Sequence, residues 1–334
     1  MKSQKRRIRK QKFFNPYDSW SLTIQNLPKR SQLYSLQPIG LGTPETESLS
    51  SYLHRLAQHH YLRPWQLYIY ELLPLIQHQE YLLHKDTKKT SLKQIFLTNK
   101  KTGSNLSVIN GLQSITPVIV TAIEQLTSRQ DLYSLTLMSW LKVFDSPELL
   151  FKPSCSWCPY CYQAWREQGQ VIYIPLLWLI EYVKFCPQHQ ISLENTCPSC
   201  NQKMLNFCQP GYCSHCGEWL GQTKYPLKLT SYFRLMGYSE ATYQRNISYL
   251  QELIAITPYL SKPPQIQDVY SYLHERCLHL DEQGLKDLSF SFWMSSHLIA
   301  KPQSCDNAYK PRISLHFLSE VFRCFNITPR QLFL

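Results

Sequence analysis

The cysteines of this chain are grouped in pairs, and that grouping constrains the fold more than any other sequence feature. Nine of the twelve cysteines lie between positions 155 and 216, most of them in pairs with two residues between them. The pairs of potential ligands are Cys158 with Cys161, Cys186 with His189, Cys197 with Cys200, and Cys213 with Cys216. Two side chains at this spacing on a tight turn can occupy adjacent corners of one zinc tetrahedron, and two such pairs complete it. The sequence therefore predicts two structural Zn²⁺ ions.

The residues beside these ligands favour tight turns. Pro159, Pro187 and Pro198 each follow the first ligand of a pair and restrict the backbone, while Gly217 follows the last ligand and can adopt positive φ. A single pair at this spacing also occurs in redox dithiols and in ordinary turns, whereas four pairs in so short a stretch indicate metal sites.

The sequence leaves the grouping of the pairs open. Sequential grouping places the first two pairs on one ion and the last two on another, whereas cross-braced grouping joins the first pair to the third and the second to the fourth. Cys155 could replace Cys161, because it forms an overlapping pair with Cys158, and Cys208 is a rival ligand for the second site. Each site has four protein ligands and no acid at a fixed spacing to activate a metal-bound water. We therefore expect structural rather than hydrolytic sites.

Composition indicates a mainly α fold in which the zinc ribbons supply the small β content. The chain has only 10 glycines against 21 prolines in 334 residues, which is typical of short helices ended by proline. No signal peptide is recognisable in the basic first twelve residues, and the apolar run 171–185 is too short, and too charged, to span a bilayer. Cysteine-rich chains without a secretion signal are typical of a reducing cytosol, so we expect a cytoplasmic protein.

The positive charge is concentrated at the start of the chain. The net charge is +12, and the first twelve residues carry seven basic side chains and no acid. A basic arm gains affinity for a phosphate backbone by releasing counterions. A solvated tail would have the same composition. The candidate nucleic-acid-binding residues are Lys2, Lys5, Arg6, Arg7, Arg9, Lys10 and Lys12.

An amphipathic helix is predicted to begin at Thr43, where a hydroxyl cap is followed by proline and two glutamates. Apolar residues then recur with helical periodicity, which leaves His54, Arg55 and Gln58 to face outward. The apolar positions are Leu49, Tyr52, Leu53, Leu56 and Ala57.

A second helix should follow a break at 59–63 and should end or kink at Pro74. Two short helices joined by a turn have the outline of a helix-turn-helix, although the same pattern also serves as plain scaffold. A third amphipathic helix is predicted to begin at Thr116 and Pro117.

The last third of the chain is predicted to be helical. Ser239 and Asp268 can each begin a helix, and Thr328 with Pro329 can begin a final short one. Cys277, Cys305 and Cys324 are isolated and are expected to be free thiols. The predicted organisation is a basic arm and extended lead at 1–40, an N-terminal helical domain with the helix-turn-helix at 41–150, a tandem zinc-ribbon region at 151–222 and a C-terminal helical domain at 223–334.

Several of these segments, in this order, carry a family resemblance. They are Gly42–Ala57, Asn110-Gly111, Leu126–Leu132 with Leu135–Leu137, and the four ligand pairs ending at Gly217. Together they resemble the TniQ/TnsD family, the target-selection proteins of a large class of bacterial transposons. The resemblance covers about residues 40–220. Fewer residues follow the zinc region than in TnsD-type proteins, so the chain is more similar to the shorter TniQ type.

The resemblance implies a noncatalytic adaptor in transposition and DNA integration. TniQ proteins link a target-recognition module to an AAA+ ATPase regulator of the TnsC kind. In CRISPR-associated transposons that module is a Cascade-type RNA-guided effector complex, whose specificity lies in base pairing. The partners expected from the resemblance are these proteins and DNA, with guide RNA as a further candidate, and the nucleic acids would be bound through backbone contacts. The expected location is the bacterial cytoplasm, in association with the nucleoid.

The sequence also bears on other functions. The sequence contains no Gly-rich phosphate loop, nucleophile elbow or carboxylate pair placed for two-metal phosphoryl transfer, so we expect no enzyme activity. The alternatives are a TnsD-type selector that recognises a DNA site without a guide RNA, a zinc-ribbon DNA-binding regulator, and a cross-braced zinc module of the ligase type.

Overall fold

The computed structural model describes residues 30–76, 109–111, 116–140, 142–143, 151–204, 209–222, 227–236, 239–277 and 315–334. The chain divides into two units, Met1–Arg30 and Ser31–Leu334, and the description that follows concerns the second. Regular structure in the described residues is helical, and strand pairing there is limited to isolated bridges. The prediction of a mainly α fold is therefore confirmed. The helix-turn-helix and the domain boundaries remain predictions.

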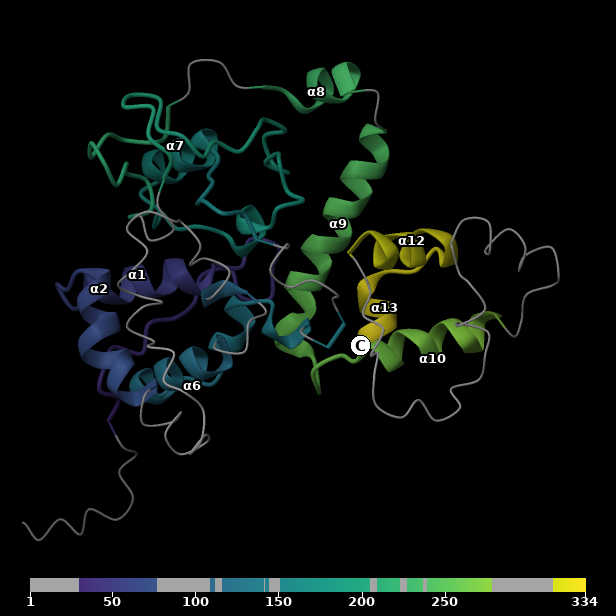
Figure 1. Cartoon of the computed structure of the whole chain (residues 1–334), viewed down its shortest axis with the longest axis horizontal. Coiled ribbons are helices and arrows are strands. Elements are labelled where there is room, and N and C mark those ends of the chain that lie inside the picture. The colour runs from purple at the N-terminus through teal and green to yellow at the C-terminus, as the bar shows by residue number, and fades with distance from the viewer. Residues whose placement is uncertain are drawn as a thin grey trace, which may run out of the picture. The chain divides into compact units, whose positions relative to one another are not determined.

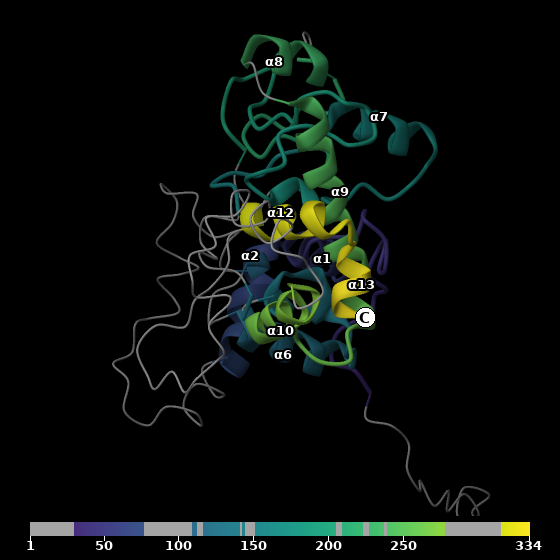
Figure 2. The same cartoon turned by 90° about the vertical axis from the view of Figure 1, so that its right-hand side faces the viewer.

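The helices of the described residues fall into three successive groups along the chain (Figures 1 and 2). The first consists of α1 (Leu49–His59), α2 (Pro64–Gln66), η1 (Leu67–Leu72), α6 (Thr116–Thr127), η2 (Leu132–Leu135) and η3 (Met138–Trp140). The cysteine region contains α7 (Pro159–Glu167) and η5 (Leu176–Leu179). The last group consists of α8 (Leu229–Met236), α9 (Glu240–Ile256), η6 (Thr257–Tyr259), α10 (Ile266–Cys277), α12 (Leu315–Phe325) and α13 (Pro329–Phe333).

The helix predicted to begin at Thr43 begins instead at Leu49. Ser48 is its cap, with a hydroxyl oxygen that accepts the Ser51 N–H. The Thr43 hydroxyl closes a tight turn, in which it donates to the Gly40 carbonyl at 2.7 Å and accepts the Glu45 N–H at 3.2 Å. A Ser or Thr hydroxyl can cap a turn as well as a helix, so the cap-and-proline pattern predicted the wrong boundary.

The outward positions predicted for His54 and Arg55 are also wrong, because both side chains are buried, whereas Gln58 is exposed as predicted. Arg55 forms a two-point ion pair with the fully buried Glu47, with Nε–Oε1 and Nη2–Oε2 distances of 2.8 and 2.7 Å. Each charge is neutralised and hydrogen-bonded by the other, which allows both side chains to be buried. Burial lowers the pKa of His54 to about 4, so its imidazole is neutral near pH 7.

The second helix is not ended by Pro74. The backbone stays helical to Ile76, the last described residue before the gap. The turns before Pro74 widen into a π-helix over Leu67–Leu72, after which the Leu73 N–H donates to the Tyr68 carbonyl. A π-turn shifts the hydrogen-bond register, and proline lacks the N–H that the α-helical register would use.

The predicted starts of the other helices agree with the structure, except at α10. Thr116 begins α6, Ser239 caps α9, and Thr328 caps α13 in a reciprocal box with Gln331. Helix α10 begins at Ile266 rather than at Asp268, and the Asp268 carboxylate accepts the Gln265 N–H at 2.7 Å from within the first turn.

Two apolar cores underlie this arrangement. One is built from α1, η1, α6 and η2. The other is shared by the cysteine region and the C-terminal helices, and it includes ligand cysteines beside residues of α9, α10 and α12. Trp140 belongs to the second core, where its indole N–H donates to the Thr257 hydroxyl at 3.1 Å and its ring packs edge-on against Phe333.

Hydrogen bonds tie the cysteine region to the helices that precede and follow it. The start of α1 pairs with the segment before η5, with Ser48 N–H bonded to the Ile174 carbonyl at 2.9 Å and Leu176 N–H to the Thr46 carbonyl at 2.8 Å. On α9, the Tyr243 hydroxyl accepts the N–H groups of Lys184 and Phe185. No helix among the described residues has the length and hydrophobicity to cross a membrane.

The Glu47–Arg55 pair should contribute strongly to stability. Glu47→Gln leaves the Arg55 guanidinium buried without its counter-charge, and removing one partner of a buried pair costs about 3–5 kcal/mol. We expect a fall of that size in the free energy of unfolding, measured by urea denaturation. Glu181→Gln is the matched control, because Glu181 pairs with Lys184 at the surface and should change stability by less than about 1 kcal/mol. Equal effects of the two variants would contradict the assignment.

Candidate metal centres

Three of the four ligand pairs lie on turns with the same backbone hydrogen bonds. In each turn the N–H of the first cysteine donates to the carbonyl five residues later, and the N–H four residues later donates back to the cysteine carbonyl. The residue at that fourth position has positive φ. The first cysteines are Cys186, Cys197 and Cys213, and the positive-φ residues are Gln190, Asn201 and Gly217. Isolated bridges close these turns, as predicted for small zinc ribbons.

The pair Cys158 and Cys161 is built differently. Cys158 is the N-cap of α7, Pro159 is its first residue, and Cys161 lies in its first turn. Pro159 therefore begins a helix, rather than stiffening a free turn as predicted. The positive end of a helix dipole favours thiolates, so this position suits metal ligands.

The structure groups the ligand pairs sequentially. In each group the four candidate ligand atoms lie within 4.8 Å of one another. The first group consists of Cys158, Cys161, Cys186 and His189, and the second of Cys197, Cys200, Cys213 and Cys216. These are the eight residues that the sequence proposed, and each group could bind one metal ion.

The distances within the first group match a tetrahedral site. Cys161 Sγ lies 3.6 Å from Cys186 Sγ and 3.3 Å from His189 Nδ1, and Cys158 Sγ lies 3.5 Å from the same nitrogen. A tetrahedron with Zn–S bonds of 2.3 Å has edges of about 3.8 Å, and edges to a nitrogen are shorter. A disulfide would bring two sulfurs to about 2.05 Å, so these cysteines are not bonded to one another.

The second group has the same dimensions but is closer to solvent. Cys197 Sγ lies 3.7 Å from Cys216 Sγ, and Cys200 Sγ lies 3.7 Å from Cys213 Sγ. Cys197 and Cys213 are buried, whereas Cys200 is half-buried and Cys216 is exposed. The second group is therefore the more accessible to water and chelators.

The cysteines of the first group compete for protons. Hydrogen bonds from Cys158 and Cys161 lower the pKa of Cys186 to about 2, while the hydrogen bond with Cys158 raises the pKa of Cys161 well above its ordinary value. One thiolate is thus stabilised at the expense of its neighbours. A divalent cation removes that competition, because it binds every cysteine as thiolate.

The rival ligands lie outside both groups or outside the described residues. Cys155 is buried but is not among the four atoms of the first site. His215 is exposed, as predicted, and its Nε2 lies 3.1 Å from the Lys203 carbonyl. The described residues do not include Cys208, Cys305, the side chain of Cys277 or the seven basic residues of the arm. Cys324 is half-buried.

A buried lysine that sequence reasoning missed holds the first group in place. Lys152 Nζ donates to the Ser156 hydroxyl at 2.9 Å and to the Trp178 and Val183 carbonyls at 2.8 and 2.6 Å. It therefore joins the segment before Cys158 to the segment before Cys186. Burial lowers the pKa of Lys152 to about 7. A single lysine before a proline belongs to no hydrophobic periodicity or motif, so its burial could not be predicted from the sequence.

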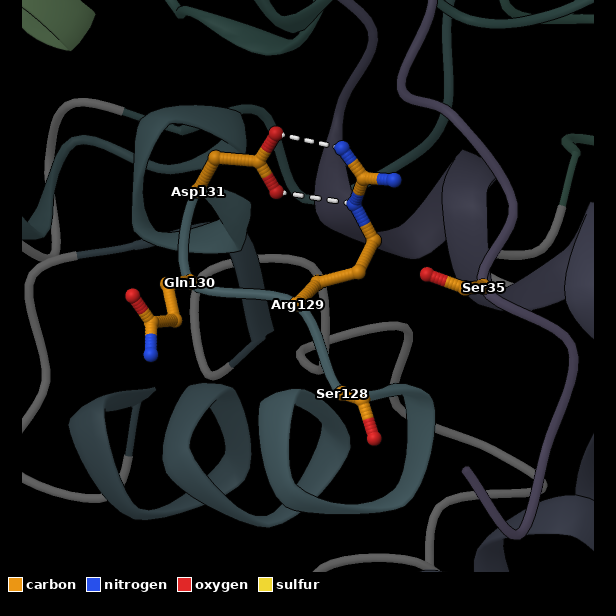
Figure 3. Close-up of a pocket in the computed structure, with 5 residues that line it drawn as sticks. All are labelled: Ser35, Ser128, Arg129, Gln130 and Asp131. Atoms are coloured by element: carbon orange, nitrogen blue, oxygen red, sulfur yellow. Dashed lines mark hydrogen bonds and ion pairs between the residues drawn. The ribbon is translucent and has the colours of Figure 1, made fainter. Parts of the chain in front are cut away.

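A surface hollow of about 400 Å³ lies beside the end of α6 (Figure 3). It is lined by Ser35 and by residues 128–131, within the Leu126–Leu132 segment of the resemblance. Arg129 and Asp131 form a two-point ion pair there, with distances of 2.8 and 2.5 Å. Because the pair neutralises its own charges, the hollow offers neither a free cation for an anionic ligand nor a free carboxylate.

A family model described as TniQ matches residues 38–193. Residues 38–193 are therefore similar to the TniQ family. The match runs from the lead before α1 through the first ligand group, and it ends before Cys197, which is earlier than the resemblance suggested. A comparison with curated proteins found no match. A TniQ domain marks a transposition-associated adaptor or target selector.

Metal content should separate the ligands from the other buried cysteine. Native mass spectrometry of the wild-type chain should show two zinc ions, and Cys161→Ser should show one, because three ligands bind zinc far more weakly than four. Cys155→Ser is the matched control and should keep two ions. Structural zinc contributes about 10 kcal/mol or more to folding, so Cys161→Ser should also lower the melting temperature. A zinc ion lost from the Cys155 variant instead would contradict the ligand set.

The buried amine should make stability depend on pH. Lys152 in the folded chain loses its proton near pH 7, whereas in the unfolded chain it keeps the proton up to its ordinary pKa of 10.5. The unfolded state therefore binds more protons between these values, and stability rises with pH. Relative to Lys152→Met, the wild-type free energy of unfolding should increase from pH 7 to pH 9.5 in urea titrations. A difference that stays constant over this range would contradict the burial effect.

Proposed function

We propose that this protein is a noncatalytic transposition adaptor. It links a target-recognition module, a Cascade-type RNA-guided effector complex, to an AAA+ ATPase regulator of the TnsC kind, and so directs DNA integration. The match of a TniQ family model to residues 38–193 carries this proposal. The effector complex and the ATPase come from the family resemblance of the sequence.

The two ligand groups are proposed to hold structural Zn²⁺. Each group supplies four sulfur or nitrogen atoms at tetrahedral spacing, which leaves no coordination position for a substrate. When bound, the metal supplies cross-linking and charge neutralisation. The residues proposed to hold it are Cys158, Cys161, Cys186 and His189 in the first site and Cys197, Cys200, Cys213 and Cys216 in the second.

The hydrogen bonds around the first site support a bridging role. The start of α1 is bonded to the strand-like segment at Ile174–Leu176, and α9 is bonded to the backbone at Lys184 and Phe185. Both groups of helices are thus attached to the segment that leads into Cys186. A zinc ion there would fix two helical surfaces in one orientation, and an adaptor needs two surfaces for two partners.

The basic arm is proposed to contact DNA or guide RNA through its phosphates. Seven positive side chains without an acid give counterion release but no sequence reading. Specificity would then reside in the recognition module.

A sequence-reading selector of the TnsD type, or a zinc-ribbon DNA-binding regulator, is the alternative. The observation that favours it is the net charge of +12 on a chain with a short helix pair at α1 and α2. These roles differ in what the isolated protein binds, because a selector or regulator finds its DNA site unaided.

Affinity capture tests the adaptor role. Tagged protein from its host should retain an AAA+ ATPase and CRISPR effector subunits, identified by mass spectrometry. Cys161→Ser should lose them and Cys155→Ser should keep them, if the first metal site orders the surfaces. Tight binding of one DNA sequence by the isolated protein, with neither partner retained, would establish the selector instead.

Salt dependence tests the arm separately. Deletion of residues 1–12 removes seven positive charges, so the slope of log affinity against log salt for DNA should flatten by up to about 5–6. The variant Lys262→Gln removes one exposed lysine of the folded part and should change the slope by less than about 1. An unchanged slope in the deletion would show that the arm is only a tail.

A further inference from the structure

Exposed aromatic rings gather at the turn between α1 and α2. Tyr61, Trp65 and Tyr70 are 98%, 48% and 62% exposed, and Tyr34, from the lead, is 56% exposed. These four are among only ten large hydrophobic residues that are so exposed in the described part of the chain. The Tyr34 ring stacks on His60 at 4.3 Å, and the Trp65 and Tyr70 rings lie 6.3 Å apart. We call these four residues the aromatic turn.

The backbone of the aromatic turn holds Tyr61 in an unfavourable conformation. Helix α1 ends with the Tyr61 N–H bonded to the Gln58 carbonyl and the Leu62 N–H bonded to the Ala57 carbonyl. This Schellman motif places Tyr61 at the left-handed position, with φ of 55°. Glycine is the usual residue there, because a Cβ is strained at positive φ. The ring of Tyr61 is almost fully exposed, so it gains no packing in return. A strained residue without internal contacts indicates a role for its side chain outside the fold.

One exposed cation, Arg63, and no acid lie between Gln58 and Tyr70. The nearest carboxylate along the chain, Glu71, accepts a hydrogen bond from Gln32 at 2.8 Å. These features favour an anionic partner that presents flat faces to aromatic rings.

We propose that the aromatic turn is a stacking surface for unpaired bases of a single-stranded nucleic acid. Base–aromatic stacking combined with positive charge is the general means of binding single strands without reading sequence. The exposed guanidinium of Arg63 lies in sequence between Tyr61 and Trp65, with no carboxylate from Gln58 to Tyr70, and a cation beside exposed rings favours this partner. The proposal goes beyond the adaptor role and does not depend on it.

Fluorescence anisotropy of a labelled 20-nucleotide oligo-dT, titrated with the zinc-loaded full-length chain, tests this surface. Tyr61→Gly and Trp65→Ala should each weaken binding about 5- to 100-fold, the range expected for loss of one stacked base. Tyr61→Gly should do so without lowering the melting temperature, because glycine suits the turn. Tyr259→Ala is the matched control, since Tyr259 is 61% exposed but lies outside the aromatic turn, and its affinity should stay within twofold of wild type.

Further measurements separate the contribution of base stacking from that of phosphate contacts. Duplex DNA should bind more weakly than the single strand, because its bases are already stacked. Deletion of residues 1–12 should flatten the salt dependence and yet leave the loss caused by Tyr61→Gly unchanged. Wild-type affinity in both aromatic variants would overturn the proposal, and so would equal affinity for single strand and duplex. Loss of a captured protein from Tyr61→Gly with unchanged oligonucleotide affinity would show that the surface binds a protein. None of these outcomes depends on the ATPase or the effector complex.

Discussion

The cysteine region is organised around two groups of closely spaced side chains that could each bind a metal ion. Three thiols and an imidazole are held within 4.8 Å of one another in the first ligand group, and four thiols in the second. In the first group, hydrogen bonds from Cys158 and Cys161 lower the pKa of Cys186, whereas the hydrogen bond with Cys158 raises the pKa of Cys161. With a divalent cation, all ligands bind in their unprotonated form. The surrounding structure is arranged to hold the ligands at this spacing: three turns with the same hydrogen bonds, one helix N-terminus, and Lys152 joining the segments before Cys158 and Cys186.

Much of this centre was predictable because its rules are local. The two-residue spacing is visible in sequence, as is Gly217 after the last pair, and the eight residues named from spacing are the eight that the structure brings together. The positive φ of Gln190 and Asn201 in the other two turns was not predicted. The grouping was not predictable, since sequential and cross-braced arrangements use the same spacings. The helical setting of Cys158 was also missed, because proline after the first ligand suits both a free turn and the first position of a helix.

The errors outside the centre have a common physical cause. The helical periodicity predicted that Arg55 is exposed, because arginine is polar. In the structure Arg55 is buried in an ion pair with Glu47. A pair between residues eight positions apart does not appear in the hydrophobic periodicity. The cap predicted at Thr43 failed for a related reason. Thr43 and Ser48 both have suitable hydroxyls, and the choice between them follows from the contacts of Thr46 and Ser48 with Ile174 and Leu176. Such long-range contacts decide boundaries that local propensity leaves equal.

The two ligand groups differ in a way that bears on their roles. The first lies within the TniQ match, is largely buried, and is attached through its flanking segments both to the start of α1 and to α9. The second lies beyond the match and has an exposed ligand, Cys216. A metal ion in the first group would therefore cross-link segments that are bonded to both sets of helices, whereas one in the second would join two turns whose flanking residues, Trp219 and Leu220, are bonded to Gln163 and Trp157. The C-terminal helices share one core with cysteines of both ligand groups, so the packing of α9, α10 and α12 is coupled to the geometry of both groups.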